Sequence, residues 1–176
     1  IMVLALLAAC TGASGPAGPE APVGMAGAGI QPEMLELFQG MAVTAAYLDE
    51  SMAIEAGYVA TEDCVASPVG AMGMHYMNVG LLTDGDIDPS QPQVLMYVPS
   101  ETGPKLAGFE YFMPLGPPGS PIPDPAPPAP SLAGHTFNGP MEGHDENMPP
   151  HYDLHIWAWM ANPDGLFEDF NPSLSC

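Results

Sequence analysis

The chain has 176 residues, of which 21 are acidic and only one, Lys105, is basic, so its formal net charge is −20. It therefore lacks the basic side chains that bind phosphate groups, which excludes sequence-independent binding to nucleic acid and electrostatic attraction to anionic lipid. The 23 prolines and 20 glycines predict a loop-rich structure, whereas 47% hydrophobic residues are enough for a folded core.

The first ten residues are continuously apolar and too few to span a bilayer as a helix. We interpret residues 1–9 as the end of a signal peptide, which we expect to be truncated because neither an initiator methionine nor a basic start precedes Ile1. Leu7-Ala8-Ala9-Cys10 resembles the bacterial lipobox, in which a signal peptidase cuts before a cysteine that then carries lipid. This resemblance implies lipidation at Cys10, a membrane anchor and a place in the bacterial cell envelope. The alternative is an ordinary secretory signal that contains a cysteine.

After Cys10, residues up to Gln31 are mostly small residues, glycine and proline, with one charged side chain. Residues 10–31 are therefore interpreted as a lipidated cysteine with a flexible tether. A single globular domain is expected over residues 32–176, because Pro32 and the acidic residues just after it favour the start of a helix.

A helix or helix pair is predicted between Pro32 and Gly57. Apolar residues recur there at three- and four-residue steps and so share one helical face. Gly40 either breaks this span into two helices or weakens it, and Gly57 ends it. We interpret the face as core packing rather than as a methionine-rich cofactor box. Its residues are Leu37, Met41, Ala45, Leu48, Met52 and Ala56.

Short runs rich in aromatic and β-branched residues follow, and they predict an antiparallel sheet. Residues 99–104, with one glycine and two prolines, are the expected hairpin connection between the second and third runs. Nine prolines between Pro114 and Pro130 predict an exposed, polyproline-like loop, either a stiff spacer or a ligand for a proline-binding module. The fold class is therefore α+β, with an N-terminal helix or helix pair packed on a small sheet. The four predicted strands are residues 73–78, 94–98, 105–113 and 153–159.

The cysteines predict one disulfide. If Cys10 carries lipid, Cys64 and Cys176 remain as an even pair, and such a pair is expected to be oxidised outside the cytoplasm. Two reduced cysteines or a metal-binding pair are the alternatives, although no CxxC spacing accompanies either cysteine.

Candidate chemistry lies in the histidines, since no nucleophile elbow, Walker loop, dinucleotide fingerprint or HExxH motif occurs. Glu110 stands inside an apolar strand, and a buried carboxylate needs a partner. Because the chain has almost no lysine or arginine, that partner must be a proton, a tyrosine, a histidine or a cation. We therefore predict a metal site formed by His75, Glu110 and His155, a set that suits zinc, iron(II) or manganese. The alternative is that Glu110 faces water.

Two further residues are candidates for the same site. Asp153 and His155 lie two apart in a predicted strand and so share one face, about 6.6 Å apart. His151 lies near the limit of a shared ion, unless the loop before it bends inward. Copper(I) is a less favoured ion, suggested by the thioethers of Met72, Met74 and Met77 around His75.

Residues 64–78, 109–113 and 151–176 together resemble an uncharacterised family of secreted bacterial proteins. The resemblance rests on the motifs CVASPVGAMGMHYMN, FEYFM and HYDLHIWAWMANPDGLFEDFNPSLSC. It covers most of residues 42–176 and implies a secreted single domain with no established activity. It also implies that Cys64 and Cys176 are the family's two cysteines, and it places His75, Glu110 and His155 inside the motif segments.

These observations predict a bacterial envelope lipoprotein whose domain binds a partner, with a His/carboxylate metal site. A mononuclear metal-dependent hydrolase or oxygenase on the same residues is the enzyme alternative, and a copper-handling periplasmic protein is a further one. The sequence does not indicate which protein or small molecule the domain binds.

Overall fold

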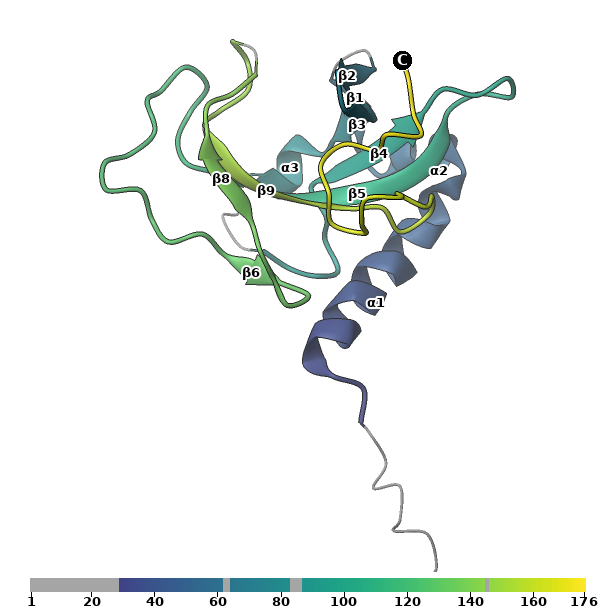
Figure 1. Cartoon of the computed structure of the whole chain (residues 1–176), viewed down its shortest axis with the longest axis horizontal. Helices are drawn as coiled ribbons and strands as arrows, with labels where there is room; N and C mark the ends of the chain where they lie inside the picture. The colour runs from purple at the N-terminus through teal and green to yellow at the C-terminus, as the bar shows by residue number, and fades with distance from the viewer. Residues whose placement is uncertain (1–28, 62–63, 83–86, 145) are drawn as a thin grey trace, which may run out of the picture.

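The computed structural model describes residues 29–61, 64–82, 87–144 and 146–176. They form an α+β domain in which helices near the N-terminus pack on one face of an antiparallel sheet, as predicted (Figure 1). The predicted signal peptide, Cys10 and most of the predicted tether lie outside the described residues. None of the helices in the described part of the chain has both the length and the apolar character of a membrane span.

The helical part consists of three consecutive pieces. Helix α1 (Pro32–Thr44) begins with the predicted proline and is followed by a 3-10 turn, η1 (Ala45–Leu48). Helix α2 (Glu50–Glu55) is capped by the side chain of Asp49, which accepts a hydrogen bond from the first turn. The helical span ends at Gly57, as predicted, where a φ of +96° favours glycine.

The predicted apolar face is wrong beyond Thr44. The tighter η1 turn and the extended backbone of Asp49 mean that α2 does not continue the phase of α1. As a result Leu48 is 55% exposed and Met52 is 44% exposed, whereas Ala53 is fully buried.

Gly40 does not break α1. It is buried in the middle of the helix, and a Cβ atom there would lie 2.6 Å from the Tyr111 hydroxyl oxygen and 2.7 Å from the Phe109 ring. Glycine therefore lets the helix backbone approach the sheet closely.

The main sheet is antiparallel throughout, in the order β1-β3-β4-β5-β9-β8, with β2 paired to β3. A separate hairpin is formed by β6 (Ser131–Leu132) and β7 (His135–Thr136), and a short helix, α3 (Val79–Leu82), follows β3. The strands of the main sheet are β1 (Val59–Ala60), β2 (Val65–Ser67), β3 (Gly70–Met77), β4 (Val94–Val98), β5 (Lys105–Pro114), β8 (Asn138–Met141) and β9 (His151–Ile156).

All four predicted strands are present as β3, β4, β5 and β9. The bounds of β4 are the predicted ones, whereas β9 begins two residues early and ends at Ile156. It ends there because the Trp157 N–H donates to the carbonyl of Leu166 and so leaves the ladder. The β4–β5 hairpin uses the predicted connection. Residues 115–130 contain no helix or strand and extend to one side of the domain (Figure 1).

The two faces of the sheet differ in what covers them. Alternate residues such as Leu95, Phe109 and Tyr111 face the helices and form the main core. The opposite face carries a smaller apolar cluster of Met96, Val98, Ala107 and Trp157. The residues predicted for the metal site share this opposite face.

The C-terminal segment, residues 157–176, lies against this helix-free face. Met160 and Leu174 pack against the smaller cluster, and the backbone of Asn171 pairs with Ala71 in β3. Trp157 donates its indole N–H to the carbonyl of Glu168 at 2.6 Å. These contacts hold the segment over the sheet.

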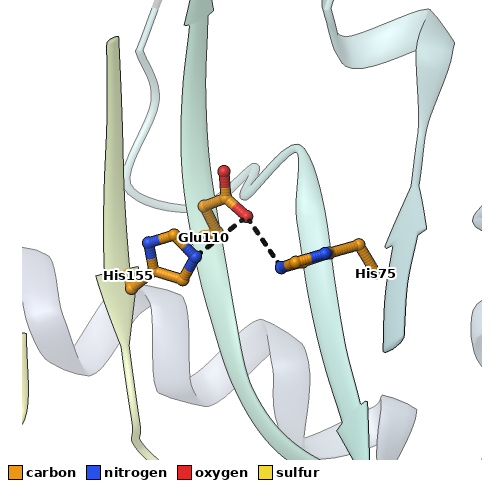
Figure 2. Close-up of side chains that lie close together, drawn as sticks. All are labelled: His75, Glu110 and His155. Atoms are coloured by element: carbon orange, nitrogen blue, oxygen red, sulfur yellow. Dashed lines mark ion pairs between the residues drawn. The ribbon is translucent and has the colours of Figure 1, made fainter. Parts of the chain in front are cut away.

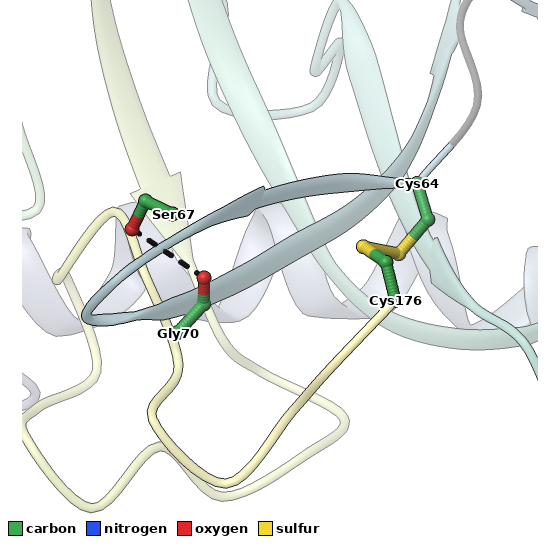
Figure 3. Close-up of a disulfide and its surroundings, with 4 residues drawn as sticks. All are labelled: Cys64, Ser67, Gly70 and Cys176. Atoms are coloured by element: carbon green, nitrogen blue, oxygen red, sulfur yellow. Dashed lines mark hydrogen bonds between the residues drawn. A yellow bond between two sulfur atoms is a disulfide. The ribbon is translucent and has the colours of Figure 1, made fainter.

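A disulfide joins the end of this segment to the start of β2. The Cys64 and Cys176 sulfur atoms are bonded at 2.06 Å, at the end of the β2–β3 hairpin opposite the turn in which Ser67 donates to the Gly70 carbonyl (Figure 3). Disulfides form and persist in oxidising compartments, so this one indicates an extracytoplasmic location.

Candidate metal centre

The candidate centre is built by neighbouring strands of the sheet. Glu110 on β5 is paired directly with His155 on β9, and Val94 on β4 separates Glu110 from β3, which carries His75. Because side chains alternate along a strand, all three residues project from the helix-free face. Figure 2 shows Glu110 between the two imidazole rings.

The spacing of the three ligand atoms suits a metal ion. Nε2 of His75 lies 3.7 Å from Oε2 of Glu110, and Nε2 of His155 lies 3.6 Å from the same oxygen. Both separations exceed the usual hydrogen-bond range of about 2.7–3.2 Å. Ligands about 2.1 Å from a tetrahedral zinc ion lie about 3.4 Å apart. One ligand atom from each residue falls within 4.8 Å of the others.

Because Glu110 is buried, it needs a proton, a hydrogen-bond donor or a positive partner. Glu110 is only 5% exposed, so the alternative in which it faces water is wrong. Burial raises the pKa of the Glu110 carboxyl, and the nearby His155 and His75 oppose that rise. The one basic side chain, Lys105, is exposed at the start of β5. No lysine or arginine therefore compensates this carboxylate.

The far side of the His155 ring faces two other carboxylates. Its Nδ1 lies 3.4 Å from Oδ1 of Asp169 and 3.9 Å from Oδ2 of Asp153. Burial by itself lowers the pKa of His155, but Glu110, Asp169 and Asp153 outweigh it and raise that pKa to about 9. Both ring nitrogens of His155 are buried without a hydrogen bond of good geometry. The carboxylates on both sides of the His155 ring therefore favour a positive group, a proton or a metal ion, at each ring nitrogen.

His151 and Asp153 lie beside the three central residues but outside their ligand set. His151 Nε2 lies 3.7 Å from Oδ2 of Asp153, and its Nδ1 lies 2.9 Å from the Pro149 carbonyl. Burial lowers the pKa of His151, yet these two partners raise it above its usual value. Oδ1 of Asp153 is buried and has no hydrogen bond.

A small cavity of about 20 Å³ adjoins the centre. Such a volume holds about one water molecule. Besides the residues already named, its walls include Met72, Met77, Met148 and His144. Met74 instead packs into the core on the helix side of the sheet, so the three methionines suggested for copper do not surround one point.

The structure thus brings His75, Glu110 and His155 together and places Asp153 and His151 next to them. Sequence reasoning missed Asp169, which forms a second possible ligand group with Asp153 and His155. It also missed Asn138, whose side-chain amide donates to Oδ1 of Asp169 at 2.7 Å. Asp169 lies in an irregular segment, where no strand periodicity relates it to His155.

The domain is an α+β protein of the helix-on-antiparallel-sheet class with a buried cluster of possible metal ligands. No protein-family model matches the chain, and neither the curated proteins nor the solved structures contain a significantly similar match.

Proposed function

We propose that this chain is an extracytoplasmic domain that binds one divalent transition metal through His75 Nε2, His155 Nε2 and the Glu110 carboxylate. The observation that carries this proposal is the position of three buried ligand atoms within 4.8 Å of one another. A divalent ion there would compensate the carboxylate that no lysine or arginine reaches.

The donor set favours zinc, followed by iron(II) and manganese. Two imidazole nitrogens and one carboxylate oxygen are common ligands of these ions. Copper(I) prefers thioether and thiolate sulfur, and only Met72 and Met77 of its suggested ligands border the cavity. A carboxylate at the centre of the group also disfavours this soft ion.

An enzyme on the same residues is the second candidate function. Three protein ligands leave a position open on a tetrahedral ion, which is the arrangement of catalytic rather than structural zinc sites. The adjoining cavity of about 20 Å³ is large enough for one water at that position. A mononuclear hydrolase or oxygenase would use this water, or a substrate that replaces it at the open coordination position. An exchangeable water on the bound metal favours this candidate, and a closed coordination shell favours a structural ion.

We also propose that the domain belongs to a lipoprotein of the bacterial envelope, anchored to the membrane through Cys10. The lipobox-like residues and the resemblance to a secreted bacterial family support this assignment. The disulfide between Cys64 and Cys176 is consistent with it. Metabolic labelling with a radioactive fatty acid, compared between the wild type and Cys10→Ser, tests the anchor.

Metal titration of protein purified without an affinity tag tests the proposed centre. After removal of metal by a chelator, isothermal titration with zinc should give one site per chain. His75→Ala and His155→Ala should each weaken zinc binding at least 100-fold, because each removes one of three ligands.

The matched control is His135→Ala. His135 is exposed and stacks on Phe167 at 3.6 Å between ring centroids, so its loss should leave zinc affinity unchanged. Circular dichroism of each variant separates loss of a ligand from loss of the fold. Absence of zinc binding by the folded wild type, or equal affinity in the ligand variants, would refute the proposal.

A further inference from the structure

A larger pocket of about 430 Å³ lies next to the candidate metal centre. It is bounded by the end of β3, by α3, by the start of the proline-rich loop and by the loop that precedes β9. Its volume falls within the range of about 300–1,000 Å³ that is usual for small-molecule sites. The lining residues include Thr61, Met77, Val79, Leu82, Pro114 and Pro149.

The pocket and the metal-site cavity share two wall residues. Met77 and Met148 line both spaces. The cavity beside the metal ligands measures only about 20 Å³, which admits one water-sized group. A larger ligand on the metal would therefore need space beyond this cavity, and the neighbouring pocket offers it.

The walls of the pocket define the chemistry of that body. They are mainly aliphatic, thioether and proline surfaces, and the polar side chains among them are the uncharged Thr61 and Asn147. Among the residues that the structure describes, none that lines the pocket is charged, and the net charge of −20 disfavours ligands with several negative groups. An uncharged apolar body fits these walls.

We propose that this pocket holds the apolar body of a small molecule whose single oxygen-donor head group binds the metal. The inference rests on the proposed metal centre and specifies the class of ligand that the centre takes. The head group occupies the open coordination position, and the body is buried against Met77, Met148 and the residues around Val79.

Two hydroxamic acids with the same head group and different tails test the inference. Octanohydroxamic acid carries a seven-carbon tail, and acetohydroxamic acid carries a single methyl group. Both are titrated into cobalt(II)-loaded wild-type protein, in which the visible absorption of cobalt reports head-group binding. The octanoyl compound should bind at least tenfold more tightly, because each buried methylene favours binding.

A pair of matched variants locates the tail. Val79 lies in the pocket and is 62% exposed, and Val69 lies away from it in the β2–β3 turn and is 65% exposed. Val79→Asn should weaken octanohydroxamate binding at least threefold and leave acetohydroxamate binding unchanged. Val69→Asn should change neither.

The contrary results distinguish failure of the pocket inference from failure of the proposed metal centre. Equal affinity for the two probes, or a tail effect that Val79→Asn does not reduce, overturns the pocket inference and leaves the metal centre standing. Failure of the folded wild type to bind cobalt or zinc overturns the proposed function itself, and with it this inference.

Discussion

Asp169 lies on the side of the His155 ring that faces away from Glu110. Its Oδ1 is 3.4 Å from Nδ1 of His155 and accepts a 2.7 Å hydrogen bond from the Asn138 amide. The contact with His155 lowers the pKa of Asp169 despite its partial burial. Metal-binding histidines usually give their second ring nitrogen to a carboxylate, which fixes the ring orientation. Asp169 is therefore the residue expected to direct Nε2 of His155 toward the proposed metal.

The exchange of Asp169 for asparagine tests this positioning role. Asp169→Asn keeps the size of the side chain but removes the negative charge, so we expect zinc affinity to fall about 10- to 100-fold. The free energy of unfolding of the metal-free protein should change far less. Glu168→Gln, at the exposed neighbouring position, is the control and should bind zinc like the wild type. Unchanged zinc affinity in Asp169→Asn would rule the role out.

Glycine usually destabilises the interior of a helix, but the close packing at Gly40 favours glycine over alanine there. Alanine normally stabilises a helix interior by about 1 kcal/mol relative to glycine. A Cβ at Gly40 would nevertheless meet Tyr111 and Phe109 at 2.6–2.7 Å. Such overpacking costs about 1–3 kcal/mol. We therefore expect no gain or a net loss of up to about 2 kcal/mol for Gly40→Ala in urea unfolding, whereas Gln39→Ala on the exposed side should be neutral or slightly stabilising. A gain of a full helix-propensity increment in Gly40→Ala would contradict the close packing.

The four long strands β3, β4, β5 and β9 were more predictable than the buried face of the helices, whereas the short strands β1, β2, β6, β7 and β8 were not predicted. Residues 94–98 and 105–113 are rich in apolar and aromatic residues, which indicates strands. Proline-containing turns mark where these strands end, so the composition and the boundaries predict the same elements. In the helical span the spacing of apolar residues runs on past Thr44, but Asp49 caps a new helix there. Asp49 is a favourable N-cap residue and so indicates the start of a new helix. The regular spacing of the apolar residues on both sides of it nevertheless suggested one continuous face.

The C-terminal segment depends on its disulfide. Residues 157–176 contain no helix or long strand, and they are held by Asn171, by Trp157 and by the Cys64–Cys176 bond. The double variant Cys64→Ser/Cys176→Ser should lose about 2–5 kcal/mol of unfolding free energy. Chemical denaturation measures this loss, and wild-type protein kept in reductant should behave like the variant. An unchanged midpoint in both samples would show that the noncovalent contacts suffice.

At the scale of the whole molecule, the shortage of basic residues predicted the site better than any motif did. Glu110 inside an apolar strand, in a chain with one lysine, required a partner from the histidines or from an ion. His75 and His155 were found because each lies in a recognisable strand. Asp169 was not, because its place beside His155 depends on how an irregular segment crosses the sheet.

Buried tyrosines make the whole fold sensitive to alkali. Burial raises the pKa values of Tyr58, Tyr97 and Tyr111 above their usual value of 10.0. Burial and a hydrogen bond to Glu50 raise the pKa of Tyr76 to about 12. In the unfolded chain these tyrosines lose their protons near pH 10, whereas in the folded chain they keep them to higher pH. Their contribution to stability is therefore complete below about pH 10 and is lost as the pH rises through the raised pKa of each tyrosine, which for Tyr76 is about 12.

Urea unfolding across this pH range measures the effect. The free energy of unfolding should fall steadily from about pH 10 upward, and the near-ultraviolet absorbance of tyrosinate should rise together with the loss of circular dichroism. Tyr76→Phe should reduce the steepness of the fall, because one group no longer titrates. Free titration of all tyrosines near pH 10 with the fold intact would contradict this account.

The spacing of the candidate ligands along the chain also affects when a metal can bind. His75, Glu110 and His155 stand far apart in sequence and meet only after β3, β4, β5 and β9 have paired. No segment of the chain shorter than residues 75–155 contains all three candidate ligands. If the proposed centre binds a metal, a polypeptide exported through a membrane in extended form would therefore cross without the ion and acquire it on the far side. The metal content of the folded protein would then reflect the ions available in that outer compartment rather than those of the cytoplasm.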